Sequence, residues 1–143
     1  AKGWAEVKTL FDSSNLKVHV IGGYNDFALL GREELKREKD RVLRACEAAN
    51  FFGVDVVRVF AGDVKNGVER EELIAQIIDC YREIMPRVAE YGIYLAIENH
   101  MHLVNDGPTL LKILEEVGSG WLKVTLDMGN FYWVGHSLKE TYE

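Results

Sequence analysis

The chain has 143 residues, of which 48% are hydrophobic and 28% are charged, and its formal net charge is −6 at pH 7. This length is enough for a domain with a real hydrophobic core, and we expect residues 1–143 to form a single domain. The acidic balance argues against a general nucleic-acid-binding protein, whose binding face would be basic, so we expect no nucleic-acid partner.

The sequence indicates neither secretion nor membrane insertion. We find no apolar run as long as a membrane span and no signal peptide at the start, so we expect a cytoplasmic protein with no membrane partner. Cys46 and Cys80 lie in helix-like stretches and resemble neither a disulfide framework nor a clustered zinc site. We therefore expect both to be buried, reduced thiols.

The chain begins with a predicted helix, strand, helix and strand. Apolar residues recur at helical spacing in residues 4–11, and residues 16–21 have the pattern of a strand. The second helix carries apolar residues from Leu35 onwards and should end at Gly53, because glycine readily adopts the left-handed conformation at a helix end. The next strand is predicted at residues 54–60.

The clearest helical pattern lies in residues 73–91, where apolar side chains recur every three or four positions. Asn66 together with Glu69 is expected to cap the start of this helix. Pro86 falls inside the pattern and is expected to kink the helix or split off its last turn. A third strand is predicted at residues 93–98.

The last third of the chain repeats the same alternation. Asp106, Gly107 and Pro108 predict the start of a helix that continues to residue 117 and stops at Gly118. The fourth strand is predicted at residues 122–127, and a final helix is expected to begin near Ser137.

Helices and strands that alternate in this way predict a parallel sheet covered by helices, either an open doubly wound sheet or a section of a (βα)8 barrel. Each predicted strand has an aliphatic side and a mixed polar side, the second carrying Lys17, His19, Arg58, Glu98 and Asp127. An open sheet has helices on both faces and is usually apolar on both, so the polar side favours the barrel. Gly22-Gly23 lacks the spacing of a phosphate-binding loop, and we expect a plain turn there.

Glu98 and Asp127 are the most informative pair in the chain, because each closes a predicted strand. Parallel strands joined through a helix end at the same edge of a sheet, and neighbours lie about 4.8 Å apart. The two carboxylates would then repel each other unless a positive group, most simply a divalent metal ion, lay between them. Alternatively, each acid caps the next helix or begins a turn. Two acids in successive units, read with the polar residues that follow them, favour a site.

Three segments resemble the xylose isomerase-like barrel superfamily: VDVVRVFAG (residues 54–62), YGIYLAIENH (residues 91–100) and LKVTLDMGNF (residues 122–131). The resemblance extends over essentially the whole chain and is greatest to the sugar phosphate isomerase/epimerase branch, which includes inositol-catabolism enzymes and ketose 3-epimerases. It implies an α/β fold, a (βα)8 barrel with a divalent metal at its C-terminal face. The metal ligands of this family are typically Glu, Asp, His and Glu, one from each of four later strands.

The resemblance also assigns roles to residues of this chain. Glu98 matches the first metal ligand and is a candidate catalytic acid or base, and Asp127 matches the second ligand. His100 and Asn130 stand where the family often places substrate-contacting groups. The ion would be Mn²⁺, Mg²⁺ or Co²⁺, with Zn²⁺ also possible. The aromatic residues 131–133 are expected either to wall a sugar pocket or to pack under the following helix.

A complete barrel takes about 250 residues, so the resemblance implies a partial TIM barrel, about the second to fifth strands of eight. The remaining His and Glu ligands would come from strands beyond residue 143. His136 follows Asp127 too closely to belong to the next strand and is expected in a loop or cap. We therefore expect a fragment, an engineered partial barrel or a portion of a longer protein. The open sheet edges of a partial barrel invite pairing with another copy, so we expect a homo-oligomer.

Three functions are consistent with these features. The first is a metal-dependent sugar or sugar-phosphate isomerase or epimerase, acting on a small sugar or polyol by proton transfer through an enediolate. The second is a non-catalytic partial barrel that self-associates. The third, a nuclease of the apurinic-endonuclease branch, is disfavoured because that branch uses a histidine-rich zinc cluster. Residues 20–23 and 59–62, at the first two strand ends, contain no histidine, and Asn130 stands where that branch usually has one.

Overall fold

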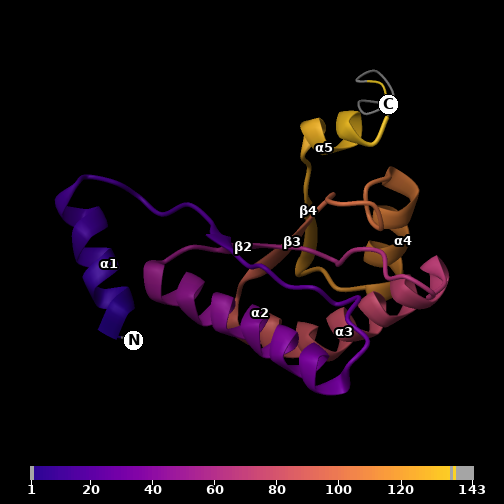
Figure 1. Cartoon of the computed structure of the whole chain (residues 1–143). Helices are drawn as coiled ribbons and strands as arrows, with labels where there is room; N and C mark the ends of the chain where they lie inside the picture. The colour runs from indigo at the N-terminus through magenta and orange to yellow at the C-terminus, as the bar shows by residue number, and fades with distance from the viewer. Residues whose placement is uncertain (1, 136, 138–143) are drawn as a thin grey trace.

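The computed structural model describes residues 2–135 and residue 137, which alternate between helices and strands along the chain (Figure 1). The helices are α1 (Lys2–Ser13), α2 (Arg32–Phe52), α3 (Arg70–Tyr91), α4 (Gly107–Val117) and α5 (Met128–Trp133). The strands are β1 (Ile21–Gly22), β2 (Val56–Val59), β3 (Tyr94–Glu98) and β4 (Leu122–Thr125). Within these residues no helix is both long enough and apolar enough to span a membrane.

The described strands form one parallel sheet in the order β1-β2-β3-β4, as the alternating pattern predicts. Each strand therefore lies beside the next one in the sequence, which is the arrangement of consecutive units in a barrel. The observed strands are shorter than the predicted ones. The largest difference is at the first, where only Ile21 and Gly22 join the ladder instead of residues 16–21.

Helices α2 and α3 cover one side of the sheet (Figure 1). The core lies in this layer, where Val57 and Val59 of β2 and Leu95 and Ile97 of β3 are fully buried. Alternate residues of the same strands, such as Arg58, point to the other side, because side chains alternate across a strand. The predicted division into an aliphatic and a mixed polar side is thus confirmed, and the polar side corresponds to a barrel interior.

Glycine ends the three long helices of the sheet-covering layer. Gly53, Gly92 and Gly118 follow α2, α3 and α4 with φ between 64° and 70°, and the N–H of each bonds a carbonyl of the last turn. Asp106 caps α4, its carboxylate accepting the Thr109 N–H at 2.8 Å. These signals explain why the sequence predicts the C-terminal end of α2 and the whole of α4 so closely.

The helix boundaries depart from the prediction in several places. Asn66 and Glu69 do not form the expected cap, since Glu69 is the N-cap residue of α3 and its side chain makes no capping hydrogen bond. Pro86 does not split off the last turn of α3, which continues to Tyr91 with the proline exposed, and the alternative, a kink, stays a prediction. Helix α5, which begins at Met128, was not predicted. Ser137 itself is not helical, and the residues over which the helix expected near Ser137 would continue lie outside the described residues. His136 lies outside the described residues.

Candidate active site

Glu98 ends β3 on the polar side of the sheet, with its side chain only 15% exposed. The Nε of Arg58, on the neighbouring strand, lies 3.3 Å from its Oε2. The other oxygen, Oε1, accepts a hydrogen bond from Asn130 Nδ2 at 3.3 Å and lies 3.4 Å from His100 Nδ1. The structure therefore brings Glu98, His100 and Asn130, three of the four predicted site residues, into one cluster.

His100 is held in place by its ring and by its backbone. The imidazole stacks on Phe60, with ring centroids 4.6 Å apart and planes 24° from parallel. The backbone N–H donates to the carbonyl of Val104 at 3.1 Å, which closes a short turn. Met101 in this turn has a left-handed backbone, with φ of 58°, a conformation uncommon for non-glycine residues. The imidazole is consequently fixed beside Glu98.

Asp127 is the N-cap residue of α5. Its Oδ1 accepts the backbone N–H groups of Gly129 and Asn130 at 2.8 and 3.1 Å. Asp127 therefore caps a helix, as the alternative to a metal site predicted, and it does so through Oδ1. Oδ2 takes no part in these capping hydrogen bonds. Asn130 contacts both acids, because its backbone N–H reaches Asp127 and its side-chain amide reaches Glu98. A metal-ligating role for Asp127 remains a prediction.

Two buried asparagines that the sequence analysis did not assign support this cluster. Asn99 is completely buried, and its amide bonds both the N–H and the C=O of Asp127, at 2.7 and 2.8 Å. It also donates to Asn105, whose own amide donates to the Asn130 carbonyl at 2.9 Å. Buried polar groups are nearly always paired, so these amides lock the end of β3 to the start of α5. A polar residue directly after a buried strand was the available signal for Asn99.

A second asparagine side chain forms a similar pair of hydrogen bonds with backbone, between the segment after β1 and the residue after β2. Asn25, which is 4% exposed, bonds the C=O and the N–H of Phe60 at 2.6 and 3.0 Å. The hydroxyl of Tyr81 donates to the same carbonyl at 2.7 Å. Burial raises the pKa of this hydroxyl well above its usual range, so it remains a donor at every physiological pH. Phe60 is thereby fixed under His100.

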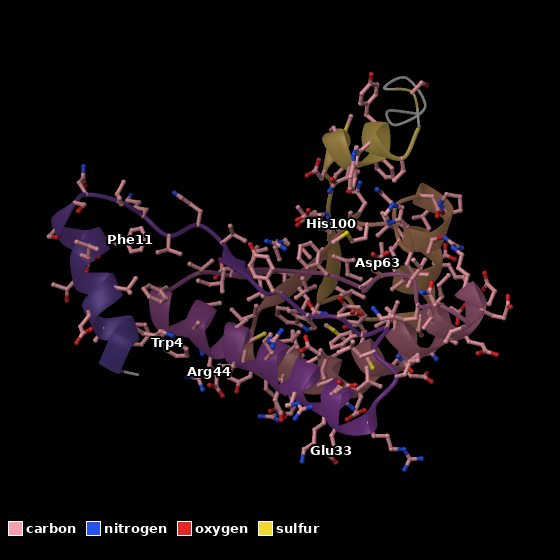
Figure 2. The ribbon with its side chains drawn as sticks, viewed as in Figure 1. Trp4, Phe11, Glu33, Arg44, Asp63 and His100 are labelled. Atoms are coloured by element: carbon pink, nitrogen blue, oxygen red, sulfur yellow. The ribbon has the colours of Figure 1, made fainter. Side chains whose placement is uncertain are left out.

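A pocket of about 430 Å³ opens on the polar side of the sheet. Figure 2 shows His100 and Asp63 on this side, opposite Glu33 and Arg44 of α2. The pocket is lined by Tyr24, Asn25, Asp26, Arg58, Phe60, Ala61, Gly62, Asp63, Glu98, His100 and Met101. Its aromatic walls are therefore Tyr24 and Phe60. Of the predicted site residues, Glu98 and His100 line it, whereas Asn130 and Asp127 are not among its lining residues.

The aromatic residues that follow Asn130 do not line this pocket. Phe131 is 7% exposed and belongs to the hydrophobic core, so it does not wall a sugar pocket; the helix under which it was expected to pack lies outside the described residues. Tyr132 and Trp133 are both 67% exposed, and the Trp133 ring lies 6.1 Å from His102.

The chemistry of the cluster partly matches a divalent metal ion. Such an ion takes several oxygen or imidazole ligands, and Glu98 and Asp127 carry suitable carboxylate oxygens. Within residues 2–135 and residue 137, however, no group of three or more His, Cys, Asp or Glu side chains is placed to hold one. The carboxylate oxygens of Glu98 and Asp127 are therefore of the type that a hard divalent ion binds. The described residues would supply only part of the ligands that such an ion needs.

Comparison with known proteins identifies the family. The model of the Xylose isomerase-like TIM barrel family matches residues 1–142, so the chain belongs to this family. A search of the curated proteins finds no significant match. The predicted fold, a partial barrel of parallel βα units, is confirmed by this match and by solved structures of the same architecture.

Three of these structures illustrate the range of the fold. The 3-keto-D-glucoside 4-epimerase YcjR from E. coli has a TM-score of 0.84 and 15% sequence identity, over 98% of this chain and 59% of its own. The probable 3-DHS dehydratase AsbF from Bacillus anthracis has a TM-score of 0.74 and 22% identity, over 99% and 51%. The IOLI protein, crystallised with a zinc atom, has a TM-score of 0.78 and 16% identity, over 96% and 50%. The chain thus spans little more than half the length of these proteins.

Proposed function

We propose that the protein is a metal-dependent isomerase or epimerase of a small sugar, sugar phosphate or polyol. The reaction would move a proton on the carbon next to a carbonyl, through an enediolate. The observation that carries this proposal is the position of Glu98 at the end of β3. Its carboxylate is largely buried, and it lines a pocket together with His100. Membership of a family that includes sugar epimerases supports the same reaction class.

Glu98 is the residue we assign to proton transfer. A catalytic base must lie within hydrogen-bond reach of the proton that it removes, which a carboxylate lining the pocket satisfies. Its Oε2 faces Arg58 and its Oε1 faces His100 and Asn130, so the carboxylate is oriented before a substrate arrives. His100, which lines the pocket, would then contact a substrate hydroxyl group, and Asn130 would support substrate binding by holding the side chains of Glu98 and His100. Pre-orientation of this kind lowers the entropy cost of reaching the transition state.

The pocket has the character of a sugar site. Its volume of about 430 Å³ lies in the range of small-molecule sites. Tyr24 and Phe60 offer aromatic surfaces for the C–H face of a sugar, and Asp26 and Asp63 offer acceptors for its hydroxyl groups. Alternating apolar and polar walls suit a polyhydroxylated ligand better than a purely apolar one.

Glu98 and Asp127 are the residues we propose as metal ligands, with Mn²⁺, Mg²⁺ or Co²⁺ as the preferred ions and Zn²⁺ possible. When bound, such an ion would act as a Lewis acid toward the substrate oxygens. Asn99, which follows Glu98 directly, bonds the backbone of Asp127, and this link supports the assignment of the two acids to one site. The zinc in the IOLI structure supports the idea of metal binding within this fold.

The proposal is tested by proton exchange, which does not require the natural substrate to be known. The protein would be incubated with Mn²⁺ and a panel of ketoses and ketose phosphates in ²H₂O, and deuterium at the carbon next to the carbonyl would be followed by NMR. We expect incorporation with at least one sugar, its loss in Glu98→Gln, and no change in Glu90→Gln, which alters an exposed acid of α3. Equal exchange in Glu98→Gln, or none with the parent protein, would refute the assignment.

A further inference from the structure

Arg58 is buried more deeply than a charged side chain usually is. It stands on β2 facing the polar side of the sheet, and its side chain is 18% exposed. The guanidinium lies over two aromatic rings, with Cζ 4.7 Å from the centroid of Tyr24 and 4.2 Å from that of Phe60. Arginine packs flat on aromatic faces in a way that lysine cannot, so this site is specific for arginine.

The sheet register directs Arg58 toward Glu98. Arg58 pairs with Ala96 of β3, and Glu98 is two residues further along the same face. The contact is made by Nε, which lies 3.3 Å from Glu98 Oε2. Gly22 pairs with Arg58 on the other side, and a Cβ at this glycine would lie 3.3 Å from Nη2. The missing side chain of Gly22 therefore leaves the space in which the guanidinium lies.

Nη1 of Arg58 is not placed to serve a ligand in the pocket. Nη1 is buried, and it has no hydrogen-bond partner among the described residues. Because Nη1 is enclosed by protein atoms, it cannot reach a substrate without rearrangement. The contact that the structure shows between Arg58 and Glu98 is the one through Nε.

We propose that Arg58 is a positioning residue for Glu98, an inference that rests on the proposed function of that carboxylate. By holding Oε2, Arg58 fixes the rotation of the carboxylate and leaves Oε1 facing His100 and Asn130. Tyr24 and Phe60 hold the guanidinium in turn, and Gly22 makes room for it. Tyr24, in the segment after β1, thereby acts on an acid of β3 through Arg58.

Replacing Arg58 should change metal affinity in opposite directions depending on whether Arg58 positions Glu98 or acts only through its charge. Removing a positive charge beside a cation site would, by Coulomb attraction alone, tighten the binding of a metal ion. Loss of positioning weakens it, and residues that orient ligands typically change metal affinity by about tenfold or more. We therefore expect Arg58→Met to bind Mn²⁺ about tenfold more weakly than the parent chain, and Arg58→Lys to recover part of the loss. Unchanged or tighter binding by Arg58→Met, measured by electron paramagnetic resonance, would overturn the proposal.

Gly22→Ala provides a second variant in case Arg58→Met does not fold. The added methyl group presses on Nη2 and leaves the charge in place, so we expect weaker Mn²⁺ binding again. Gly120→Ala is its control, since a Cβ at Gly120 would meet no atom within 4 Å. Equal Mn²⁺ affinity in the two alanine variants would count against the role of Arg58.

A double-mutant cycle without metal separates failure of this inference from failure of the proposed function. Arg58→Met and Glu98→Gln should be coupled by about threefold or more in the unfolding equilibrium constant, whereas Arg58→Met and Glu90→Gln should be independent. No coupling between Arg58 and Glu98 would overturn the positioning contact, whatever the metal affinity. If Arg58 and Glu98 are clearly coupled but the parent chain binds no Mn²⁺, the positioning of Glu98 would be supported and the proposed function would be overturned.

Discussion

The side chain of Asn99 pairs with the backbone of Asp127 as another strand residue would. Its Oδ1 accepts the Asp127 N–H at 2.7 Å, and its Nδ2 donates to the Asp127 carbonyl at 2.8 Å. The hydrogen bonding between β3 and β4 is thus continued one step beyond the ladder, up to the residue that caps α5. Asn99 follows Glu98 directly, so this pairing ties the two acids together.

Replacing Asn99 by alanine should destabilise the protein by roughly 2 kcal/mol or more, because the backbone of Asp127 and the amide of Asn105 would lose buried partners. Urea unfolding would measure the change. Asn50→Ala is the control, because Asn50 is exposed on α2 and its replacement should change the unfolding free energy by less than about 0.5 kcal/mol. Equal effects of the two substitutions would contradict the role of Asn99.

Gly62 should tolerate no side chain. Its φ is 142°, and a Cβ there would lie 2.5 Å from Asp26 Oδ1 and 2.8 Å from the backbone nitrogen of Ala28. Strain and overpacking together predict that Gly62→Ala lowers the unfolding free energy by about 2–4 kcal/mol. Gly120→Ala, where the added methyl meets no neighbour, should be nearly neutral. A thermal melt of both variants checks the difference, and a neutral Gly62→Ala would show that this loop is placed differently.

Stability should fall at alkaline pH through Cys46. Burial, and to a smaller extent the negative charge of Glu47, raises the pKa of this thiol to about 12. Above an unfolded pKa near 9 the unfolded chain releases the proton while the folded chain keeps it, so stability declines from that pH up to the folded pKa. Between pH 9 and pH 10 the loss from this thiol should be about 1 kcal/mol. Urea unfolding of the parent and Cys46→Ala should show a shallower decline in the variant, and parallel curves would exclude Cys46 as the cause.

We expect the chain to self-associate through the open parts of its sheet. β1 and β4 are the edges of the described sheet, and Val20 and Leu126 beside them are 50% and 55% exposed. Unpaired strand edges and exposed apolar side chains favour contact with another copy. Sedimentation at micromolar concentrations should show dimers or larger species, reduced by Leu126→Lys but not by Leu111→Lys, which changes an exposed leucine of α4. A monomer throughout this range would contradict the expectation.

Much of the fold follows from local patterns in the sequence. The fourth strand begins at Leu122 as predicted, and Gly53 and Gly118 end their helices where expected, because each signal acts within a few residues. The first strand shows the limit of such patterns. Residues 16–20 alternate like a strand, but Ile21 already pairs with Val57 near the start of β2. The residues before Ile21 therefore have no neighbouring strand to bond with.

The candidate site also has residues that local sequence patterns could predict and contacts that they could not. Glu98 and His100 could be placed together because they are two residues apart on one face of the predicted strand, whereas Asn130 was assigned through the family resemblance. The Asp127 cap was an alternative that the sequence left open, and helix α5 itself was not predicted. The packing of Arg58 on Tyr24 and Phe60 unites segments with no shared pattern, so no local signal indicates it.

The central claim, that Glu98 and Asp127 hold one divalent ion, is tested most directly by Mn²⁺ titration of two isosteric variants. Glu98→Gln and Asp127→Asn remove one charge each, and asparagine still caps a helix, so both should remain folded. Asp106→Asn, at the cap of α4, is the matched control. We predict weak binding by the parent chain, binding at least about tenfold weaker in both site variants, and parent-like binding in the control. Binding unchanged in Glu98→Gln and Asp127→Asn, or lowered equally in all three, would contradict the metal site.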